Sequence, residues 1–331
     1  MVTPRAVRLS DVAAVAGVSK ATASKALNGS PLVSAATTAR VREAAERLDF
    51  RPNALAQSFA SGRSRTVGLL THRATATFSR AVVMGAILEL GRRERAALVF
   101  DGRIHAHHEM SESIRTLQDR RIDGLLVVGA GFGRVTPSIT HHFGVPVTYA
   151  FAASDNPDDS VFVPDNEQAG YLAARHLLDG GRTRIVYVSA GREDLAVHRR
   201  EAGMRRALDE AGLEPVATLY GSWRQEWGEQ AVRMLLDAGT RFDAVFCGND
   251  HMGFGVLDTL MDRGIRVPDD VAVVGVDNWE ELVVDQKLRR LTTIDLDLMR
   301  VGAVAADNVI EASSSGGERL IEPKVVLGPS S

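Results

Sequence analysis

Residues 10–27 read SDVAAVAGVSKATASKAL, and this stretch predicts two short helices joined by a tight turn. Ser10 precedes an apolar run, so we expect it to cap a first helix that ends at Gly17. Ser19 follows after one apolar residue and is expected to cap a second helix over residues 20–27. Two helices joined so closely around a glycine form a helix-turn-helix, whose second helix enters the major groove of DNA.

The next segment predicts a third helix, which would close a small core. Asn28 and Gly29 end the second helix, and Ser34 can cap a third helix that runs through Leu48. The apolar positions expected to face this core are Val12, Ala13, Val15, Ala16, Ala23, Ala26, Leu27, Val41, Ala44, Ala45 and Leu48.

The outward positions near the start of the second helix carry short or basic side chains, namely Lys20, Ala21, Thr22 and Lys25. Such groups suit base edges and phosphates. Residues 1–63 hold nine basic side chains against four acidic ones, a net charge of +5, which leaves −8 for the remainder at the overall charge of −3. The asymmetry favours a polyanion-binding head joined to a body of another kind. An alternative is a small helical bundle whose cationic surface is only solvated.

The segment that follows reads RPNALAQSFA at residues 51–60 and predicts one further, very short helix. Pro52 ends the third helix, Asn53 can cap the new one, and residues 54–60 favour helix over little more than two turns. A helix this short is marginal alone in water. We therefore expect it to need DNA and a partner chain.

The first part of the chain resembles the head of LacI/GalR-family bacterial transcription regulators through the run LSDVAAVAGVSKATASKALNGSPLVSAATTARVREAAERLDFRPNALAQSFASGRSRTVGLL. The resemblance implies that three residues of the second helix read the operator and that two contact phosphates. Ala21 departs from the larger polar residues common in the family and offers only apolar contact, for example to a thymine methyl group. The DNA-contacting residues that we expect are Ser10, Ser19, Lys20, Ala21, Thr22, Lys25, Asn28, Asn53, Ala56 and Phe59.

The same resemblance implies that the short helix pairs with its twin in the minor groove and inserts an apolar side chain, usually leucine, into a central base step. Phe59 occupies the matching position. An aromatic wedge can also unstack a base step and bend the duplex. The alternative is that Phe59 packs on the domain that follows.

From Thr66 onward, apolar segments of strand length alternate with segments of helix length. Such alternation is typical of parallel sheets covered by helices on both faces, and two sets of about four strands predict two doubly wound lobes. Strands are expected at 67–70, 97–100, 124–128, 146–150, 185–188, 216–219, 244–247 and 271–274, and helices at 81–94, 167–179, 199–211 and 226–236. Ligands of such sheets bind beyond the carboxyl ends of the strands.

The body resembles the LacI/GalR effector domain, itself similar to periplasmic sugar-binding proteins, through the runs VPDNEQAGYLAARHLLDGG, HRREAGMRRALDEAG, CGNDHMGFGVLD, IRVPDDVAVVGVDN and LRRLTTIDLDLMRVG. The resemblance implies an α/β effector domain of two doubly wound parallel-sheet lobes after an all-α head and its hinge helix. It assigns effector contacts to Arg200, Asn249 and Asp277, and stacking on the ligand to Trp223. Such polar side chains can hold hydroxyl groups, and an indole face suits the C–H face of a pyranose.

Two further positions expected near the effector depart from sugar-responsive relatives. Phe151 stands where many of them have an aspartate, and His72 occupies the rim of the first strand, which favours a larger or differently hydroxylated ligand. The other assignments have structural alternatives. Asn249 and Asp250 could cap a helix that begins at His251, Asp277 could form a turn, Arg200 could be an exposed charge, and Trp223 or Trp227 could be a core aromatic.

An enzyme would need a nucleophile, a metal or a phosphate loop, and each signal in this chain is weak. The tract HAHH, with His105, His107 and His108, is predicted to lie in a surface loop, and no closely spaced cysteines accompany it, so no metal site is expected. Residues 129–133 read GAGFG without the Lys-Ser/Thr of a phosphate loop. The carboxylates Asp165, Asp250 and Asp277 have no matched base. We therefore expect neither enzymatic activity nor a cofactor.

The composition, with 45% hydrophobic and 24% charged residues, is that of a globular protein. No apolar run approaches the roughly 20 residues that span a bilayer, and residues 1–8 lack the apolar core of a signal peptide, so we expect no membrane partner. The single cysteine, Cys247, lies in an apolar run and cannot form an internal disulfide. A cytoplasmic protein is predicted, associated with the nucleoid when it is bound to its operator.

Together these patterns predict a sequence-specific transcriptional regulator, in particular a repressor, that binds a palindromic operator in double-stranded DNA as a homodimer. A small-molecule effector, a mono- or oligosaccharide bound between the lobes, would control the operator affinity. The alternative is a cytoplasmic sugar receptor without operator specificity. The expected boundaries are 1–51 for the helix-turn-helix domain, 52–64 for the hinge and linker, and 65–331 for the effector domain, with a first lobe of about 65–163 plus 295–320 and a second of about 164–292 plus the C-terminal strand.

Overall fold

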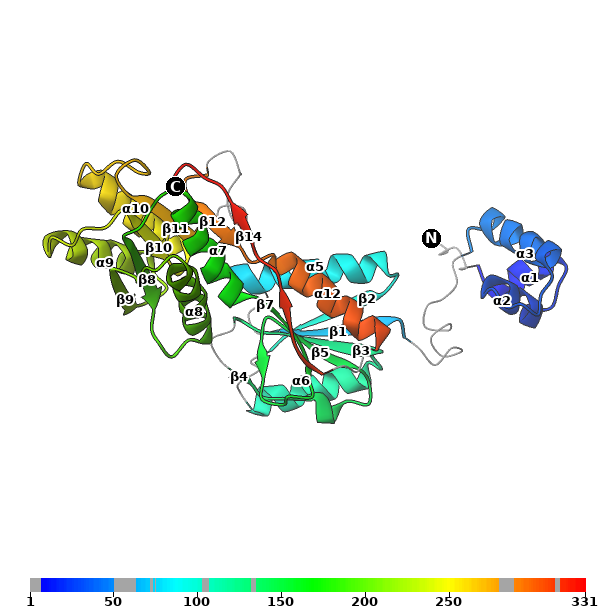
Figure 1. Ribbon diagram of the computed structural model, residues 1–331. Helices are drawn as coiled ribbons and strands as arrows, with labels where there is room; N and C mark the ends of the chain where they lie inside the picture. Colours follow the sequence, from blue (N-terminus) through cyan, green and yellow to red (C-terminus); the bar gives the residue numbers. More distant parts are fainter. Residues whose placement is uncertain are drawn as a thin grey trace, which may run out of the picture. The chain divides into compact units, whose positions relative to one another are not determined.

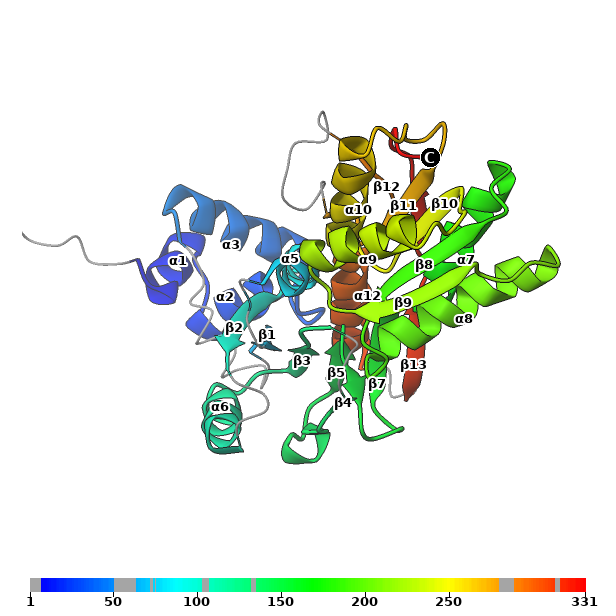
Figure 2. The ribbon, with the colours of Figure 1, turned by 90° about the vertical axis from the view of Figure 1, so that its left-hand side faces the viewer.

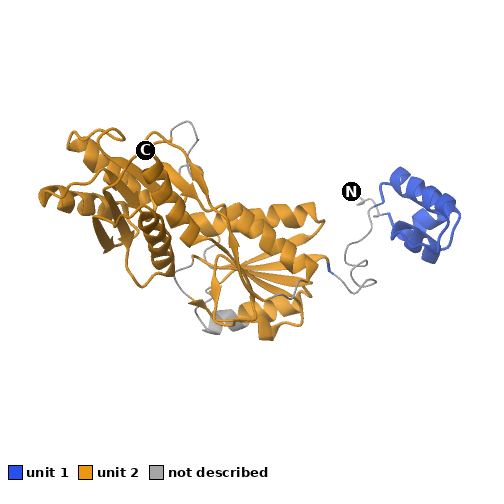
Figure 3. Cartoon of the chain, viewed as in Figure 1, with its two compact units in different colours: residues 1–64 blue, residues 65–331 orange. Residues whose placement is uncertain are grey.

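The computed structural model describes residues 7–50, 64–71, 74, 76–102, 107–131, 135–279, 289–312 and 316–331. The chain divides into two compact units, residues 1–64 and residues 65–331, coloured blue and orange in Figure 3. The predicted hinge helix at 54–60 and the site residues Asn53, Ala56, Phe59 and His72 lie outside the described residues.

The first unit contains three helices, α1 (Leu9–Ala16), α2 (Lys20–Leu27) and α3 (Ala35–Arg47). The predicted caps of the last two are confirmed, because Ser19 Oγ accepts from the Thr22 amide at 3.1 Å and Ser34 Oγ accepts from the Thr37 amide at 3.3 Å. Gly17 ends α1 with a φ of 64°, a value that favours glycine. The buried apolar side chains of the three helices pack together as one cluster: Val12, Ala13, Ala16, Ala23, Ala26, Val41, Ala44 and Ala45.

Two details of the first helix differ from the prediction. Ser10 is not its cap, since α1 already begins at Leu9 and the main-chain N–H of Arg8 donates to the Asp11 carboxylate at 2.8 Å. A negative charge in the first turn suits the positive end of the helix, which explains why Asp11 takes this role. Val15 is 41% exposed rather than buried, because the buried face of this short helix is formed by Val12, Ala13 and Ala16. Leu27 and Leu48 are half-buried and pack on the cluster.

The second unit contains two six-stranded sheets, as expected for two doubly wound lobes, although each has more strands than predicted. The first sheet has the spatial order β13 (Gly317–Ile321), β7 (Ser160–Pro164), β5 (Val147–Ala150), β3 (Gly124–Val128), β1 (Thr66–Thr71) and β2 (Ala96–Asp101). The second has the order β14 (Lys324–Val326), β12 (Thr292–Asp295), β11 (Ala272–Val276), β10 (Ala244–Cys247), β8 (Ile185–Ala190) and β9 (Ala217–Gly221). Within both sheets the strand pairs are parallel except β12 with β14. A small sheet joins β4 (Val135–Thr136) to β6 (Ala153–Ser154).

Helices cover both faces of each sheet, because alternate strand residues point to opposite sides. In the first lobe, Val67 and Leu69 pack toward the clustered helices α5 (Thr77–Arg92) and α12 (Leu298–Glu311), whereas Leu70 packs toward α6 (His107–Asp119). In the second lobe, Tyr187 packs toward α7 (Asn166–Asp179) and α8 (Leu195–Glu210), whereas Val186 packs toward α9 (Gln225–Asp237) and α10 (Asp250–Asp262). A short 3-10 helix, η1, spans Thr140–His142.

The histidine tract is not a surface loop throughout, since α6 begins at His107 and includes His108. The run that follows, EMSESIRTLQD, buries Ile114 and Leu117 three residues apart, which is helical spacing. Within the described ranges, no three His, Cys, Asp or Glu side chains are grouped as a metal site would require. Nor does any helix of the described residues have the length and apolar character needed to cross a membrane.

The chain crosses between the two lobes three times, after Pro164, after Asp295 and after Ile321. In Figures 1 and 2 the red C-terminal segment runs along both lobes, with β13 beside β7 and β14 beside β12. Each lobe is therefore assembled from segments that lie far apart in the sequence. The strands of the two lobes end around one shared space, which contains the candidate site.

Candidate functional site

A cavity of about 660 Å³ lies at the carboxyl ends of strands from both sheets. Its wall is formed by residues that directly follow strands, including Gly129 after β3, Phe151 after β5, Gly191 after β8 and Asp277 after β11. The cavity thus lies where ligands of such sheets are expected, beyond the strand ends. The described residues that form the wall are Phe78, Gly129, Ala130, Gly131, Thr136, Phe151, Asn166, Ala190, Gly191, Glu193, Asp194, Ala196, Arg200, Gly221, Ser222, Trp223, Asn249, His251, Asp277 and Leu296.

Five of the six residues predicted near the effector meet at this cavity: Phe151, Arg200, Trp223, Asn249 and Asp277. They come from four loops and one helix that are separated by up to 126 positions. Sequence reasoning did not identify Asn166, Asp194, Phe78 or His251 as part of the wall. The sequence pattern could have identified Asn166 and Asp194, because each lies between a strand and the helix that follows it.

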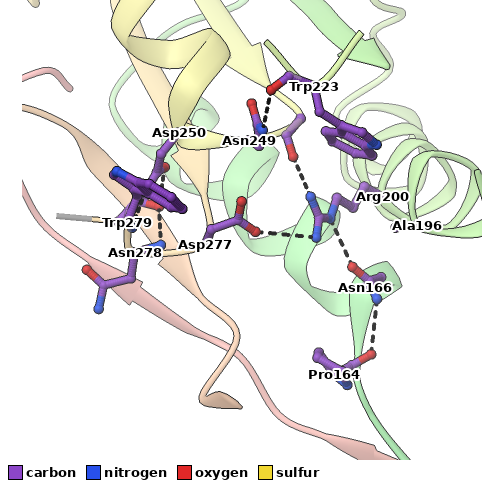
Figure 4. Close-up of polar contacts among 12 residues, drawn as sticks. Pro164, Asn166, Ala196, Arg200, Trp223, Asn249, Asp250, Asp277, Asn278 and Trp279 are labelled. Carbon is purple, nitrogen blue, oxygen red and sulfur yellow. Dashed lines mark hydrogen bonds and ion pairs between the residues drawn. The ribbon is translucent and has the colours of Figure 1, made fainter. Parts of the chain in front are cut away.

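Arg200 projects from α8 and is only 5% exposed, so the alternative of an exposed charge is wrong. Its Nε donates to Asn166 Oδ1 at 2.9 Å, and its Nη1 donates to the carbonyl of Gly248. Its Nη2 lies 3.7 Å from Asp277 Oδ1, as Figure 4 shows. The guanidinium carbon is 5.6 Å from the centre of the Trp223 ring. A buried cation is thereby held by hydrogen bonds and placed against a carboxylate and an indole.

Asp277 follows β11 and is 9% exposed, with a φ of 113° that a non-glycine residue rarely adopts. Its amide donates to the carbonyl of Ile294 at 2.9 Å, which fixes this unusual backbone against β12. Burial raises the pKa of the Asp277 carboxyl to about 7, and the neighbouring Arg200 opposes that rise. The acid can therefore both donate and accept hydrogen bonds near neutral pH.

Asn249 lies in the cavity wall and also caps a helix, so the predicted cap is observed and the effector contact stays a prediction. Its Oδ1 accepts from the Met252 amide at 2.9 Å, which begins α10. Its Nδ2 donates to the main-chain carbonyl of Trp223 at 3.1 Å. Asn249 thus ties the start of α10 to the loop that carries the indole.

Trp223 is half-buried, and a hydrogen bond at the edge of its indole ring orients the ring. Nε1 donates to Asp194 Oδ2 at 3.1 Å, while Asp194 Oδ1 accepts from the Ala196 amide at 2.8 Å and caps α8. Both Trp223 and Trp227 pack on the core of the second lobe, but the Nε1 of Trp227 donates to the carbonyl of Ser189 at 2.9 Å. Of these two tryptophans, Trp223 is the one in the cavity wall.

Three aromatic rings contact one another next to the cavity, and two of them, Phe78 and His251, are part of its wall. Phe78, at the start of α5 in the first lobe, contacts the edge of Trp279 in the second lobe, with ring centres 5.7 Å apart. Trp279 also contacts His251, with ring centres 4.1 Å apart, and its amide donates to Asp250 Oδ2 at 2.7 Å. Burial lowers the pKa of His251, so this imidazole is neutral at neutral pH. The cavity wall therefore combines polar side chains with aromatic rings.

The predicted DNA-contacting residues in the first unit are mostly accessible. Lys20, Ala21, Lys25 and Asn28 are exposed on or directly after α2, and Thr22 is half-buried with its hydroxyl 2.8 Å from Ser19 Oγ. Ser10 is exposed on the first turn of α1. Helix α2 thus exposes the charged side chains of Lys20 and Lys25 and the methyl group of Ala21 at the surface.

Two family models match the chain. Residues 8–53 match bacterial regulatory proteins of the lacI family, and residues 64–326 match periplasmic binding proteins and the sugar-binding domain of the LacI family. The HTH-type transcriptional repressor PurR of Vibrio parahaemolyticus is 32% identical over 307 residues, which cover 92% of this chain and 91% of the relative. Catabolite control protein A of Priestia megaterium is 32% identical and covers 90% of each chain.

Solved structures of similar fold cover nearly the whole chain. A Lac repressor dimer bound to its operator and the anti-inducer ONPF superposes with a TM-score of 0.73 at 23% identity, over 98% of this chain and 99% of that one. A complex of the transcriptional regulator CelR with cellobiose superposes with a TM-score of 0.64 at 28% identity, over 98% of this chain and 100% of that one. These likenesses match the order of a helical head and a two-lobed α/β body.

Proposed function

Because the chain belongs to the LacI family of bacterial regulatory proteins, we propose that it is a transcriptional repressor whose operator affinity is controlled by a sugar bound in the 660 Å³ cavity. Its relatives are transcriptional repressors, and the chain is a regulatory protein rather than an enzyme. In this proposal two copies bind a palindromic operator, residues 1–51 read the DNA, and residues 52–64 connect them to the effector domain.

The observation that carries the sugar assignment is the position of Arg200 between the Asp277 carboxyl group and the Trp223 ring. A vicinal pair of hydroxyl groups can accept from a guanidinium and donate to a carboxylate, which satisfies both charged side chains at once. The indole beside them offers a flat face for the C–H side of a sugar ring. The relative CelR is described in complex with cellobiose, which supports a carbohydrate of one or two rings.

Phe151 supports a particular kind of sugar. It is 7% exposed and forms part of the cavity wall, at the position where an aspartate is expected in many sugar-responsive relatives. An aromatic wall cannot accept hydrogen bonds from hydroxyl groups, and a hydroxyl buried without a partner costs free energy. The proposed sugar therefore turns an apolar edge, such as a deoxy carbon or a ring face, toward Phe151.

Control of the operator follows from differential binding. A sugar shifts the protein between two arrangements only by the difference in its affinity for them. We infer that closure of the lobes around the sugar favours one arrangement of the paired hinge segments over the other. We propose that the sugar releases the DNA, and the test below distinguishes release from stronger binding.

The test is footprinting of the purified protein on DNA that flanks its coding region, with glucose, galactose, xylose, maltose or cellobiose added separately. We expect protection of an imperfect palindrome, with an affinity that falls steeply with salt, and loss of protection with one of these sugars. Absence of any protected site would refute the repressor assignment and favour a sugar receptor. Protection that no sugar alters would refute the sugar assignment.

Two matched variants separate the parts of the proposal. Arg200→Ala is expected to keep the footprint and abolish the response to sugar, because it removes the buried cation of the cavity. Arg205→Ala is its control, since Arg205 lies on the same helix and pairs with Glu201 at 2.8 Å near the surface. Arg205→Ala should respond to sugar like the unmodified protein.

A further inference from the structure

The helices α7 and α8 of the second lobe cross with their backbones in direct contact. A β-carbon on Gly170 of α7 would overlap the carbonyl group of Arg200 on α8 and lie only 2.8 Å from its Cα atom. A β-carbon on Gly203 would in turn overlap the carbonyl of Glu167 and lie 2.7 Å from the Tyr171 amide nitrogen. No side chain separates the helices at this crossing, so the main chain of Arg200 rests on α7 itself.

The first residue of α7 also holds the side chain of Arg200. Asn166 is 2% exposed, and its Oδ1 accepts from Arg200 Nε at 2.9 Å. Its Nδ2 donates to the carbonyl of Pro164 at 3.3 Å, as Figure 4 shows. Rotation of the amide by half a turn would place a donor against Arg200 and an acceptor against Pro164, so the amide has one favourable orientation.

The contacts of the guanidinium with Asn166 and Gly248 are tighter than its contact with Asp277. Nε and Nη1 make hydrogen bonds to Asn166 and to the Gly248 carbonyl, whereas the Nη2 to Asp277 distance is 3.7 Å. A hydrogen bond between N–H and oxygen is normally shorter than 3.2 Å. Hydrogen bonds to Asn166 at the start of α7 and to the Gly248 carbonyl after β10 therefore position the guanidinium more closely than Asp277 does.

Close glycine crossings recur in this fold, which gives an internal comparison. In the first lobe, a β-carbon on Gly302 of α12 would overlap the carbonyl of Val82 on α5 and lie 2.9 Å from the Ala86 amide nitrogen. Of the residues described, neither Gly302 nor Val82 is part of the cavity wall. Close glycine crossings are thus a general way of packing helices in this fold. Of these two crossings, only that of α7 with α8 concerns the candidate site, because it contacts the main chain of Arg200.

We propose that α7 is a positioning element of the effector site, in which Gly170 fixes the main chain of Arg200 and Asn166 holds the Nε of its guanidinium. The proposal rests on the proposed role of Arg200 in effector binding. Reacting or binding groups must be held within a fraction of an ångström, so a displaced α8 would remove Arg200 from its place even though its side chain is unchanged.

The test follows the Nε–H resonance of Arg200 by NMR in full-length protein labelled with ¹⁵N-arginine, with no sugar added, and Arg200→Lys assigns the resonance. In the unmodified protein we expect exchange of this proton with water to be slowed, because it is buried and hydrogen-bonded. Gly170→Ala and Asn166→Ala are expected to shift the resonance and speed the exchange by about tenfold or more, as loss of a charged hydrogen bond implies. Asn166→Asp should exchange more slowly than Asn166→Ala, because a carboxylate oxygen can also accept from Nε, although the bond from Nδ2 to the Pro164 carbonyl is lost.

Gly302→Ala is the matched control, since its added methyl group meets the same kind of backbone overlap in the other lobe. It is expected to lower the melting temperature about as much as Gly170→Ala and to leave the Arg200 resonance in place. If Gly170→Ala does not fold, the pair Asn166→Ala and Asn166→Asp still decides. An unchanged resonance in Gly170→Ala, an equal change in Gly302→Ala, or exchange in Asn166→Asp as fast as in Asn166→Ala would each overturn the proposal. No sugar is needed, so failure of every sugar to bind would count against the proposed function and not against the positioning by α7.

Discussion

Asp277 combines a buried carboxyl group with a backbone conformation that favours glycine. An aspartyl carboxyl in an unfolded chain has a pKa near 3.8, whereas burial raises the pKa of Asp277 to about 7. Between these two pH values the folded protein holds a proton that the unfolded chain has released. The contribution of this group to the free energy of unfolding therefore falls as the pH rises from about 4 to about 7, and it is constant above that.

Asp277→Asn is expected to remove this dependence on pH. Relative to the unmodified protein, the variant should gain on the order of 2 kcal/mol in free energy of unfolding between pH 5 and pH 7.5. Urea unfolding at the two pH values measures the change. Asp237→Asn is the control, because Asp237 is exposed and pairs with Arg263 at 3.3 Å near the surface. An identical difference between Asp277→Asn and the unmodified protein at both pH values would contradict the prediction.

Asp194 serves two partners with its two carboxylate oxygens, the Ala196 amide and the Trp223 indole. Asp194→Ser is expected to keep the helix cap, since serine caps as well as aspartate, and to lose the indole contact. The free energy of unfolding should change by less than about 1 kcal/mol, and sugar affinity should fall by about three- to tenfold. Tryptophan emission should change as well, and this change should vanish when Asp194→Ser is made in a Trp223→Phe background. Unaltered emission in Asp194→Ser would show that the carboxylate does not orient the ring.

Among the elements, α2 and α3 begin with the same cap, which allows a matched comparison. Ser19 Oγ and Ser34 Oγ each accept from the amide three residues ahead and lie 2.8 Å and 3.0 Å from a threonine hydroxyl. Replacing either serine by alanine should cost about 1 kcal/mol in stability. Only Ser19→Ala should also lower operator affinity, by about tenfold, because α2 is the helix proposed to read DNA. Anisotropy titrations with operator DNA at one fixed salt concentration compare the two variants, and equal affinities would refute the assignment of α2.

Continuous apolar runs predicted most of the strands from the sequence, although β7, which reads SVFVP, was missed. The run 244–247 reads AVFC and is β10 as expected. Strand β12 reads TTID and was not predicted, although Thr292 and Thr293 are buried. The hydroxyl of Thr293 donates to Asp250 at 2.6 Å, and that of Thr292 donates to the Gly328 carbonyl at 2.9 Å. These partners lie 36 to 43 positions away, so no local pattern reveals them.

The candidate site likewise contains residues that could be predicted from the sequence and residues that could not. Resemblance placed Arg200, Asn249 and Asp277 near the effector, and the fold brings them to one cavity. Asn166 was missed because its bond to Arg200 spans 34 positions and depends on how two helices cross. Ser10 failed as a cap for a local reason, since Asp11 competes for the same end of the helix and a carboxylate is the stronger acceptor.

At the scale of the whole second unit, two described contacts join the lobes at separate places. Arg199 of α8 forms a two-point ion pair with Glu318 of β13, at 2.5 Å and 3.2 Å. Phe78 of the first lobe meets Trp279 of the second at the cavity. Aromatic pairs contribute about 0.5–1.5 kcal/mol beyond their buried area, and partly exposed ion pairs about 0.2–1 kcal/mol. The aromatic contact should therefore contribute more to lobe closure.

Phe78→Ala is expected to shift the ratio of closed to open lobes by about two- to tenfold, and Glu318→Gln by less than about fivefold. Distances between one spin label on each lobe report this ratio, and the buried Cys247 should not react with the label. Glu229→Gln is the control, because it breaks an ion pair with Arg233 inside α9. Distance distributions that are the same in all three variants would show that neither contact governs closure.

The three crossings between the lobes also have a consequence for how the protein is made. The first sheet lacks its edge strand until residues 317–321 have left the ribosome, and the second lacks β14 until residues 324–326 follow. Both lobes therefore remain incomplete even when most of the chain has already left the ribosomal tunnel. A ribosome that stalls shortly before residue 317 therefore leaves two incomplete halves rather than one finished and one missing, and such a product is a natural substrate for chaperones and proteases.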